Sequence, residues 1–206
     1  VRWGSGMNAF EKHGIGKLSY SSADMFARDQ GFWCLKYLHK YREPTSASMA
    51  RGLAAERGLD IALRTPGADA DVACKKAVED FNKETAFGVP EEDRERERGY
   101  IPEMVKQALP VLQPLGVPTS YQQRLEIQLP EVPVPVVMYL DWTYDDQGFF
   151  VDLKTTTRCS SDISHSHRKQ GALYQHGTGL KARFCYVTPK RCELYDLTDA
   201  GDDLEW

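Results

Sequence analysis

Two aspartates and a lysine, Asp141, Asp152 and Lys154, are the side chains with the clearest capacity for chemistry in this sequence. They lie in a stretch, residues 139–154, that alternates between apolar and polar positions around the turn-forming run Asp-Asp-Gln-Gly at 145–148. This pattern predicts a β-hairpin. Because side chains alternate along a strand, one face of the hairpin is apolar and the other carries all three charged side chains.

The expected register pairs Tyr144 with Phe149, which places Asp141 directly opposite Asp152. Opposed residues in an antiparallel pair have Cβ atoms about 5 Å apart. Two ionised carboxylates at that distance repel by roughly 3 kcal/mol at an effective dielectric of about 20. A hard divalent cation would turn the repulsion into attraction, since Mg²⁺ takes one or two carboxylates and keeps water ligands. We therefore predict a metal site here, although carboxylates on a hairpin are more often a solvated face.

A third carboxylate, Glu56, is expected on the inward face of a helix over 46–64. At 100° per residue it shares an apolar stripe and lies away from the neighbouring arginines. The stripe contains Met49, Gly52, Leu53, Leu59 and Leu63, and the arginines are Arg51, Arg57 and Arg64. A carboxylate in such a stripe is costly unless it is paired or bound to metal. A buried ion pair, an edge position that reaches solvent and a metal-ligand role all remain open, with Asp60 as the alternative ligand.

Gln170 and Tyr174 are expected on one face of a helix over about 162–176, because residues four apart project together. A glutamine and a tyrosine could bind a phosphate or sugar and stack on a base. Gln/Tyr pairs on helix surfaces are usually inert, so this pair is informative only together with the carboxylates.

The elements that would position these residues follow from apolar periodicity and from helix breakers. Helices are expected over 19–42, 46–64, 69–86 and about 91–112, with the mixed-charge run 91–98 as a solvated helix start that has no binding role. Strands are expected over 121–129, on both arms of the hairpin, and over 181–188 and 191–197. This order predicts an α/β or α+β domain with a central mixed sheet flanked by helices.

The composition is that of a soluble globular domain, with 41% hydrophobic and 27% charged residues in a chain of 206. No apolar run is long enough to span a bilayer and no secretory signal is visible, so we expect a cytoplasmic protein without a membrane partner. The net charge of −4 means that any nucleic-acid surface must be a local patch. This counts mildly against a nucleic-acid partner.

The five cysteines are widely spaced and contain no C-x-x-C pair, so neither a zinc site nor an iron–sulfur cluster is indicated. They are Cys34, Cys74, Cys159, Cys185 and Cys192. The opening residues, 1–6, read as a cloning scar before Met7. We therefore expect a single domain over 7–206, with a helical insertion at about 66–115.

Together these motifs resemble the PD-(D/E)XK nuclease superfamily, in particular its RecB-like and lambda-exonuclease-like branch. The family pattern is Gly-x-x-x-(His or Glu) on a helix, an Asp on a strand, Asp/Glu-x-Lys on the next strand and Gln-x-x-x-Tyr on a helix. The matching residues are, in order, Gly52 with Glu56, Asp141, Asp152 with Lys154, and Gln170 with Tyr174. The resemblance covers about residues 18–190. It departs from the RecB pattern at Glu56, where that branch usually has His, and in lacking the cysteines of an iron–sulfur cluster.

The resemblance implies a restriction-endonuclease-like core with an N-terminal helical region, and a phosphodiesterase that uses one or two Mg²⁺ or Mn²⁺ ions. Asp141 and Asp152 would hold the metal with the Leu153 carbonyl, and Glu56 would complete one side directly or through water. Lys154 would orient or deprotonate the attacking water and offset charge in the transition state. Residues expected to contact DNA are Gln170, Tyr174, Ser19, Ser21, Thr155, Thr156, Arg158 and Lys169.

The function that the resemblance implies is a DNA exonuclease acting at ends of double or single strands, in phage or bacterial recombination and repair. A homo-oligomer and a single-strand annealing or recombination partner are further expectations. The alternatives are an endonuclease of the same fold, an inactive nucleic-acid- or protein-binding module, and a metal-dependent hydrolase of a small molecule. The intact Asp152 and Lys154 argue against an inactive module.

Overall fold

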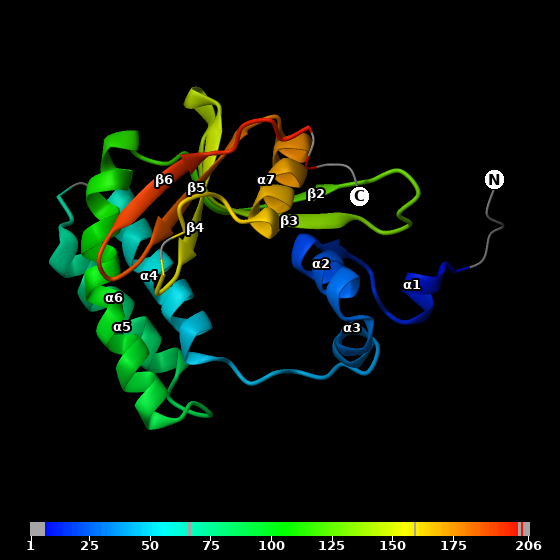
Figure 1. Cartoon of the computed structure of the whole chain (residues 1–206), viewed down its shortest axis with the longest axis horizontal. Helices are drawn as coiled ribbons and strands as arrows, with labels where there is room; N and C mark the ends of the chain where they lie inside the picture. Colours follow the sequence, from blue (N-terminus) through cyan, green and yellow to red (C-terminus); the bar gives the residue numbers. More distant parts are fainter. Residues whose placement is uncertain (1–6, 66, 159, 202, 204–206) are drawn as a thin grey trace. The chain divides into compact units, whose positions relative to one another are not determined.

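The structure is a computed structural model that describes residues 7–65, 67–158, 160–201 and 203 (Figure 1). The predicted cloning scar, residues 1–6, and Cys159 lie outside the described residues. The chain forms two compact units, one of Val1–Glu43 with Arg124–Tyr139 and one of Pro44–Gln123 with Leu140–Trp206. Among the described helices, none combines the length and the apolar character that a membrane crossing requires.

The two units contain both helices and strands. They are α1 (Ala9–Lys12), α2 (Tyr20–Arg28), α3 (Gln30–Tyr37), α4 (Ala47–Arg64), α5 (Ala70–Glu84), α6 (Glu91–Leu112) and α7 (His165–Thr178), with 3-10 turns η1 (Gln113–Leu115) and η2 (Asp145–Gln147). The helices predicted over 46–64, 69–86 and 91–112 are confirmed, and the segment predicted as a helical insertion contains α5 and α6.

The single helix predicted over 19–42 is wrong, because the structure has two helices there. Asp29 breaks the helix with an extended backbone, at φ −151° and ψ 89°. Its carboxylate then caps the second helix by accepting a hydrogen bond from the Phe32 amide at 2.8 Å. An Asp at a helix start satisfies an amide that has no partner within the helix, which favours a break at this position.

The strands form one six-stranded mixed sheet, as predicted. They are β1 (Leu18–Ser19), β2 (Ser120–Ile127), β3 (Val136–Tyr144), β4 (Phe149–Thr155), β5 (Lys181–Val187) and β6 (Cys192–Asp196). The order is β1-β3-β4-β5-β6, and β2 also pairs with β3. The β3–β4 hairpin has the predicted register, with Tyr144 opposite Phe149 and Trp142 opposite Val151. Strand β4 is parallel to β5, and α7 makes the crossover between them.

In the second unit, α4, α5 and α6 cover one face of the sheet and α7 covers the other (Figure 1). Alternation along β4 turns Val151 into the core beneath the three helices and turns Phe150 and Asp152 toward α7. Helix α7 approaches the sheet closely at Gly171, where an added Cβ would lie 2.7 Å from Leu197 Cδ2 and 2.8 Å from Phe184 Cε2. This close approach brings Gln170 within reach of β4.

The buried face of α4 differs from the predicted stripe. Met49 is 62% exposed and Leu53 is 37% exposed, whereas Arg51 is only 5% exposed. The helix buries its small residues instead, because α5 comes so close that a Cβ on Gly58 would lie 2.6 Å from the carbonyl oxygen of Ala73.

Arg51 is buried because the Arg51 Nη1 atom donates to Glu97 Oε2 of α6. Glu97 is itself only 6% exposed, so the charged run at 91–98 is not wholly solvated, contrary to prediction. A buried guanidinium and carboxylate are tolerated when they pair with each other.

Candidate active site

The second unit brings the three predicted carboxylates together from three elements. Glu56 comes from α4, Asp141 from β3 and Asp152 from β4. Asp141 Oδ2 accepts a hydrogen bond from the Leu153 amide at 2.8 Å, which ties it to the strand that carries Asp152. The Cα pairs of the hairpin end at Trp142 and Val151, and this bond continues the contact between its arms toward Asp152. The side chains of the two aspartates therefore lie near each other, and Glu56 is close enough for its charge to act on Asp141.

A residue that the sequence did not single out, Gln122 of β2, joins two of these acids. The Gln122 Nε2 atom donates to Glu56 Oε1 at 2.5 Å and to Asp141 Oδ1 at 3.0 Å. The Gln122 backbone is left-handed, with φ at 50°, which is uncommon for a residue with a side chain. No sequence motif identifies Gln122, because its contacts with the two acids depend on this left-handed backbone conformation within the strand.

Burial and mutual repulsion change the acidity of the carboxylates. Burial raises the pKa of Asp141 well above its usual value, and the negative charges of Asp152 and Glu56 raise it further. Burial also raises the pKa of Glu56, and Asp152 adds to the increase. Hydrogen bonds from Gln122 and Tyr121 offset part of the Glu56 change. The protein thus holds these carboxylates at a cost when no cation is present.

Lys154 is held beside Asp152 by direct contact and by Gln170. Its Nζ lies 2.6 Å from Asp152 Oδ2 and donates to Gln170 Oε1 at 3.0 Å. Gln170 Nε2 in turn donates to Asp152 Oδ1 at 3.2 Å. Burial lowers the pKa of Lys154, but the charges of Asp152 and Asp141 more than compensate, so its pKa is raised overall. Lys154 is therefore a protonated ammonium group at neutral pH, suited to orienting and stabilising negative groups.

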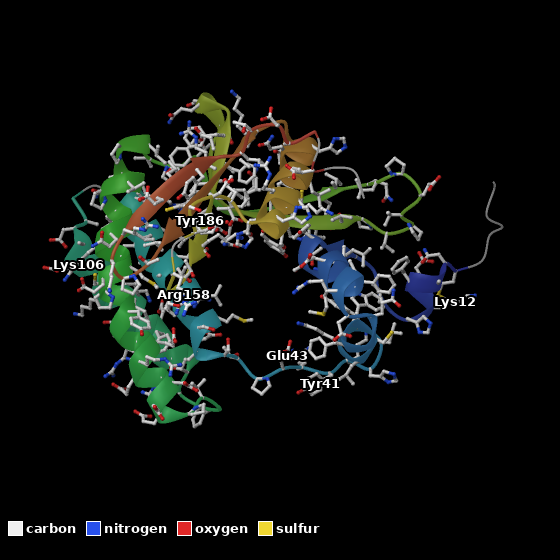
Figure 2. All side chains as sticks on the ribbon, viewed as in Figure 1. Lys12, Tyr41, Glu43, Lys106, Arg158 and Tyr186 are labelled. Atoms are coloured by element: carbon white, nitrogen blue, oxygen red, sulfur yellow. The ribbon has the colours of Figure 1, made fainter. Side chains whose placement is uncertain are left out.

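An open groove of about 820 Å³ adjoins the lysine. Figure 2 labels two of its lining residues, Arg158 and Tyr186. The lining consists of Ser46, Ser48, Met49, Arg51, Gly52, Leu153, Lys154, Thr155, Thr156, Arg158, Ser160, His167 and Tyr186. Hydroxyl groups and cationic side chains predominate among its polar residues, and none of the described lining residues carries a carboxylate. Such a lining suits the binding of phosphates.

The remaining residues predicted to contact DNA are placed differently from one another. Thr155 and Thr156 line the groove, whereas Lys169 lies on α7 and is not among the lining residues. Tyr174 is buried, with its ring centroid 6.1 Å from that of Phe150, so it packs between α7 and β4.

Ser19 and Ser21 belong to the first unit. Ser19 Oγ caps α2 by accepting a hydrogen bond from the Ser22 amide at 3.2 Å, and it lies 3.1 Å from Ser21 Oγ. The structure thus accounts for Ser19 as a helix cap, and the DNA contacts of both serines stay predictions.

The donor set at the acids consists of oxygens, which suits Mg²⁺ or Mn²⁺. Within the described part of the chain, no three His, Cys, Asp or Glu side chains are already arranged to hold a metal ion. The carboxylates would therefore need further oxygen donors, for which the Leu153 carbonyl was predicted. Asp60, the alternative ligand, is engaged elsewhere: its Oδ1 accepts from Trp142 Nε1 at 3.2 Å and lies 3.6 Å from Arg64 Nε.

Among solved structures, one that is similar in fold to this chain carries the name of a nuclease. A crystal structure titled "Putative exonuclease" from Eubacterium rectale is 15% identical, with a TM-score of 0.64, over 99% of this chain and 82% of its own. A second structure, that of SSO0001, is 14% identical over 74% of this chain and 80% of its own, with a TM-score of 0.35, too low to support an argument. No protein-family model and no curated protein matches the sequence. The chain therefore shares the fold of the Eubacterium rectale protein, a mixed sheet flanked by helices.

Proposed function

We propose that this protein is a Mg²⁺- or Mn²⁺-dependent DNA exonuclease. The observation that carries the proposal is the group of carboxylates Glu56, Asp141 and Asp152, of which Glu56 and Asp152 are buried, with the Lys154 ammonium 2.6 Å from Asp152. Carboxylates whose pKa values are raised by burial and mutual repulsion, next to a lysine held in place, are typical of a catalytic site. The fold shared with the Eubacterium rectale protein, and the name of that protein, support the same activity.

The carboxylates and the Leu153 carbonyl would hold one or two Mg²⁺ or Mn²⁺ ions, which polarise the phosphate and lower the pKa of a bound water. Asp141 is oriented for this by the Leu153 amide, and Asp152 by Gln170. Both aspartates thereby keep fixed positions within the neighbouring strands β3 and β4.

Lys154 holds its proton at Nζ and offers it as a hydrogen-bond donor. Lys154 would orient or deprotonate the attacking water and would stabilise the negative charge that develops on the phosphate. Gln170 fixes the ammonium group in place through its Oε1. Gln170 therefore acts by positioning Lys154 and Asp152, in addition to the DNA contact that its motif predicts.

The groove beside Lys154 is the proposed path of the DNA strand. Arg158 supplies a cation and Thr155 and Thr156 supply hydroxyl groups at its wall. Phosphate contacts of this kind hold a strand without reading its sequence. A recombination or repair setting, a homo-oligomer and an annealing partner remain expectations from the family resemblance.

The proposal is tested with Lys154→Ala on end-labelled linear duplex, linear single strands and closed circular DNA, in buffer with Mg²⁺ or Mn²⁺. We expect the wild type to degrade linear DNA only, and chelation to stop it. Loss of the lysine should lower the rate by about 10²–10³-fold, the usual effect of removing one transition-state donor. Lys106→Ala, at an exposed lysine of α6, is the matched control and should keep full activity.

Circular dichroism would show that the variants keep the fold. Undiminished cleavage by Lys154→Ala would contradict the proposed role of the lysine. Cleavage of closed circles by the wild type would instead indicate an endonuclease.

A further inference from the structure

Gln122 has no place in the proposed mechanism, yet its side chain occupies the centre of the site. Its amide nitrogen contacts Glu56 Oε1 at 2.5 Å and Asp141 Oδ1 at 3.0 Å. The β2 strand adopts a left-handed backbone at this residue. A conformation that is unfavourable for most residues is kept only when the surrounding structure holds it there.

The longer of these two distances is also the spacing expected between neighbouring ligands of a small cation, and the shorter is a close hydrogen bond. Mg²⁺ binds oxygens octahedrally at 2.0–2.1 Å, so adjacent ligand atoms are about 3 Å apart. The amide nitrogen lies 3.0 Å from one carboxylate oxygen and 2.5 Å from the other. The end of the Gln122 side chain therefore lies close enough to both carboxylates to share a cation with them.

The amide can change from donor to ligand without leaving this position. A half-turn about the bond between Cγ and Cδ exchanges Nε2 for Oε1, and the two ends of an amide are nearly the same size. Without a cation, the NH₂ group donates to Glu56 and Asp141, as observed. With a cation between the carboxylates, the carbonyl oxygen is the end that is attracted to it.

We propose that Gln122 is a further ligand of the site cation, supplying Oε1 beside Glu56 and Asp141 when the ion binds. This inference rests on the proposed function. Gln122 would add a fourth side-chain oxygen donor to the three carboxylates of the site. An amide suits both states, whereas a carboxylate at this position would add a fourth negative charge to the site and leave Glu56 and Asp141 without a hydrogen-bond donor between them.

The test measures Mn²⁺ binding directly, by titration calorimetry on the full chain, so that it does not depend on catalysis. We expect Gln122→Ala to weaken Mn²⁺ binding about 10-fold or more, within the range known for groups that support a metal site. Gln122→Glu keeps an oxygen at the same reach and should bind Mn²⁺ at least as tightly as the wild type. Gln123→Ala, at the next residue of β2, is the control and should bind as the wild type does.

Thermal unfolding of the same proteins separates a ligand from a mere hydrogen-bond donor. Gln122→Glu should melt at a lower temperature than the wild type without metal, because the acids then lack their donor. Saturating Mn²⁺ should raise its melting temperature by more than it raises that of the wild type. Gln122→Asn keeps an amide and a residue type that tolerates the left-handed backbone but is one methylene shorter, so it should fold and bind Mn²⁺ weakly.

Three results would overturn the inference. Gln122→Ala and Gln122→Asn could both bind Mn²⁺ within twofold of the wild type, which would show that the side chain is no ligand. Gln122→Ala and Gln122→Glu could be equally weak, which would leave Gln122 as a donor only. A wild-type protein that binds no Mn²⁺ would remove the proposed function as well, and that outcome is distinct from the first two.

Discussion

Glu56→Gln should stabilise the metal-free protein, although it removes a side chain of the proposed active site. The glutamine has the same shape, and its Oε1 can still accept the hydrogen bond from Gln122. Tyr121, which hydrogen-bonds Glu56 in the wild type, has a hydroxyl that can accept from the new NH₂ group. The substitution therefore removes a buried charge while keeping the packing.

The size of the gain follows from the geometry. Both carboxylate oxygens bond the same nitrogen of Gln122, so Glu56 Oε1 and Asp141 Oδ1 are at most about 5.5 Å apart. Two unit charges at that distance repel by about 3 kcal/mol at an effective dielectric of about 20. Replacing a charge-assisted hydrogen bond by a neutral one costs about 1 kcal/mol. The net gain in the free energy of unfolding is then about 1–2 kcal/mol, or roughly 2–8 °C in Tm for a chain of this size.

The gain should depend on pH in a defined direction. The pKa of Glu56 is raised in the folded protein, so folded chains bind more protons than unfolded chains between the two pKa values. Wild-type stability without metal is therefore greatest below the unfolded pKa and falls as the pH rises through the folded pKa. Glu56→Gln removes the contribution of Glu56 to this fall, so the advantage of the variant should be largest near pH 8 and shrink as the pH approaches 4.

Urea unfolding followed by circular dichroism in the presence of a chelator, at pH 5 and pH 8, measures both effects. Glu103→Gln, at an exposed position on α6, is the matched control and should change stability by less than about 0.5 kcal/mol. A Glu56→Gln protein that is less stable than the wild type at pH 8 would refute the reasoning. It would show that the carboxylate is a structural partner and not an unrelieved charge.

Three further substitutions test the packing that positions the site. Gly58→Ala should destabilise the protein by about 1–3 kcal/mol, because the added Cβ would lie 2.6 Å from the Ala73 carbonyl oxygen. Thermal melts measure this loss. An unchanged Tm would show that α4 and α5 can move apart to make room for the methyl group. Arg51→Ala should cost about 3–5 kcal/mol in urea unfolding, because the buried Glu97 loses its buried partner and keeps only the half-exposed Arg96, 3.3 Å away. The double variant with Glu97→Ala should recover part of this loss, and no recovery would contradict the pairing.

Much of the fold followed from local patterns in the sequence. The hairpin register was predictable because a two-residue period and a turn signal fix which residues face each other, and the pairs at Tyr144 and Trp142 agree with it. The helix breaks were less predictable: Asp29 lies inside an apolar periodicity, and only its capping bond to Phe32 shows that one helix ends and another begins there.

The site was predictable where a motif carried it and not where contacts between distant elements did. Glu56 and Asp141 could be proposed from their place on a helix and a strand, but Gln122 reaches them through a backbone conformation that no residue pattern announces. Arg51 was predicted to lie away from the inward stripe of its helix, and its burial was missed because a helical wheel cannot show a partner on α6. Such pairings join residues far apart in sequence, and periodicity carries no information about them.

Because α4, β3 and β4 each contribute one acid, the three meet only after the chain has folded. An ion that requires all of them has no equivalent binding place on the unfolded polypeptide. Its binding energy would then add wholly to resistance against unfolding, by about 2.7 kcal/mol at a concentration of 100 times its Kd. Protease digestion with and without Mn²⁺ would measure this coupling between ion binding and folding. The concentration of divalent ions would then control the protein's resistance to proteolysis as well as its activity.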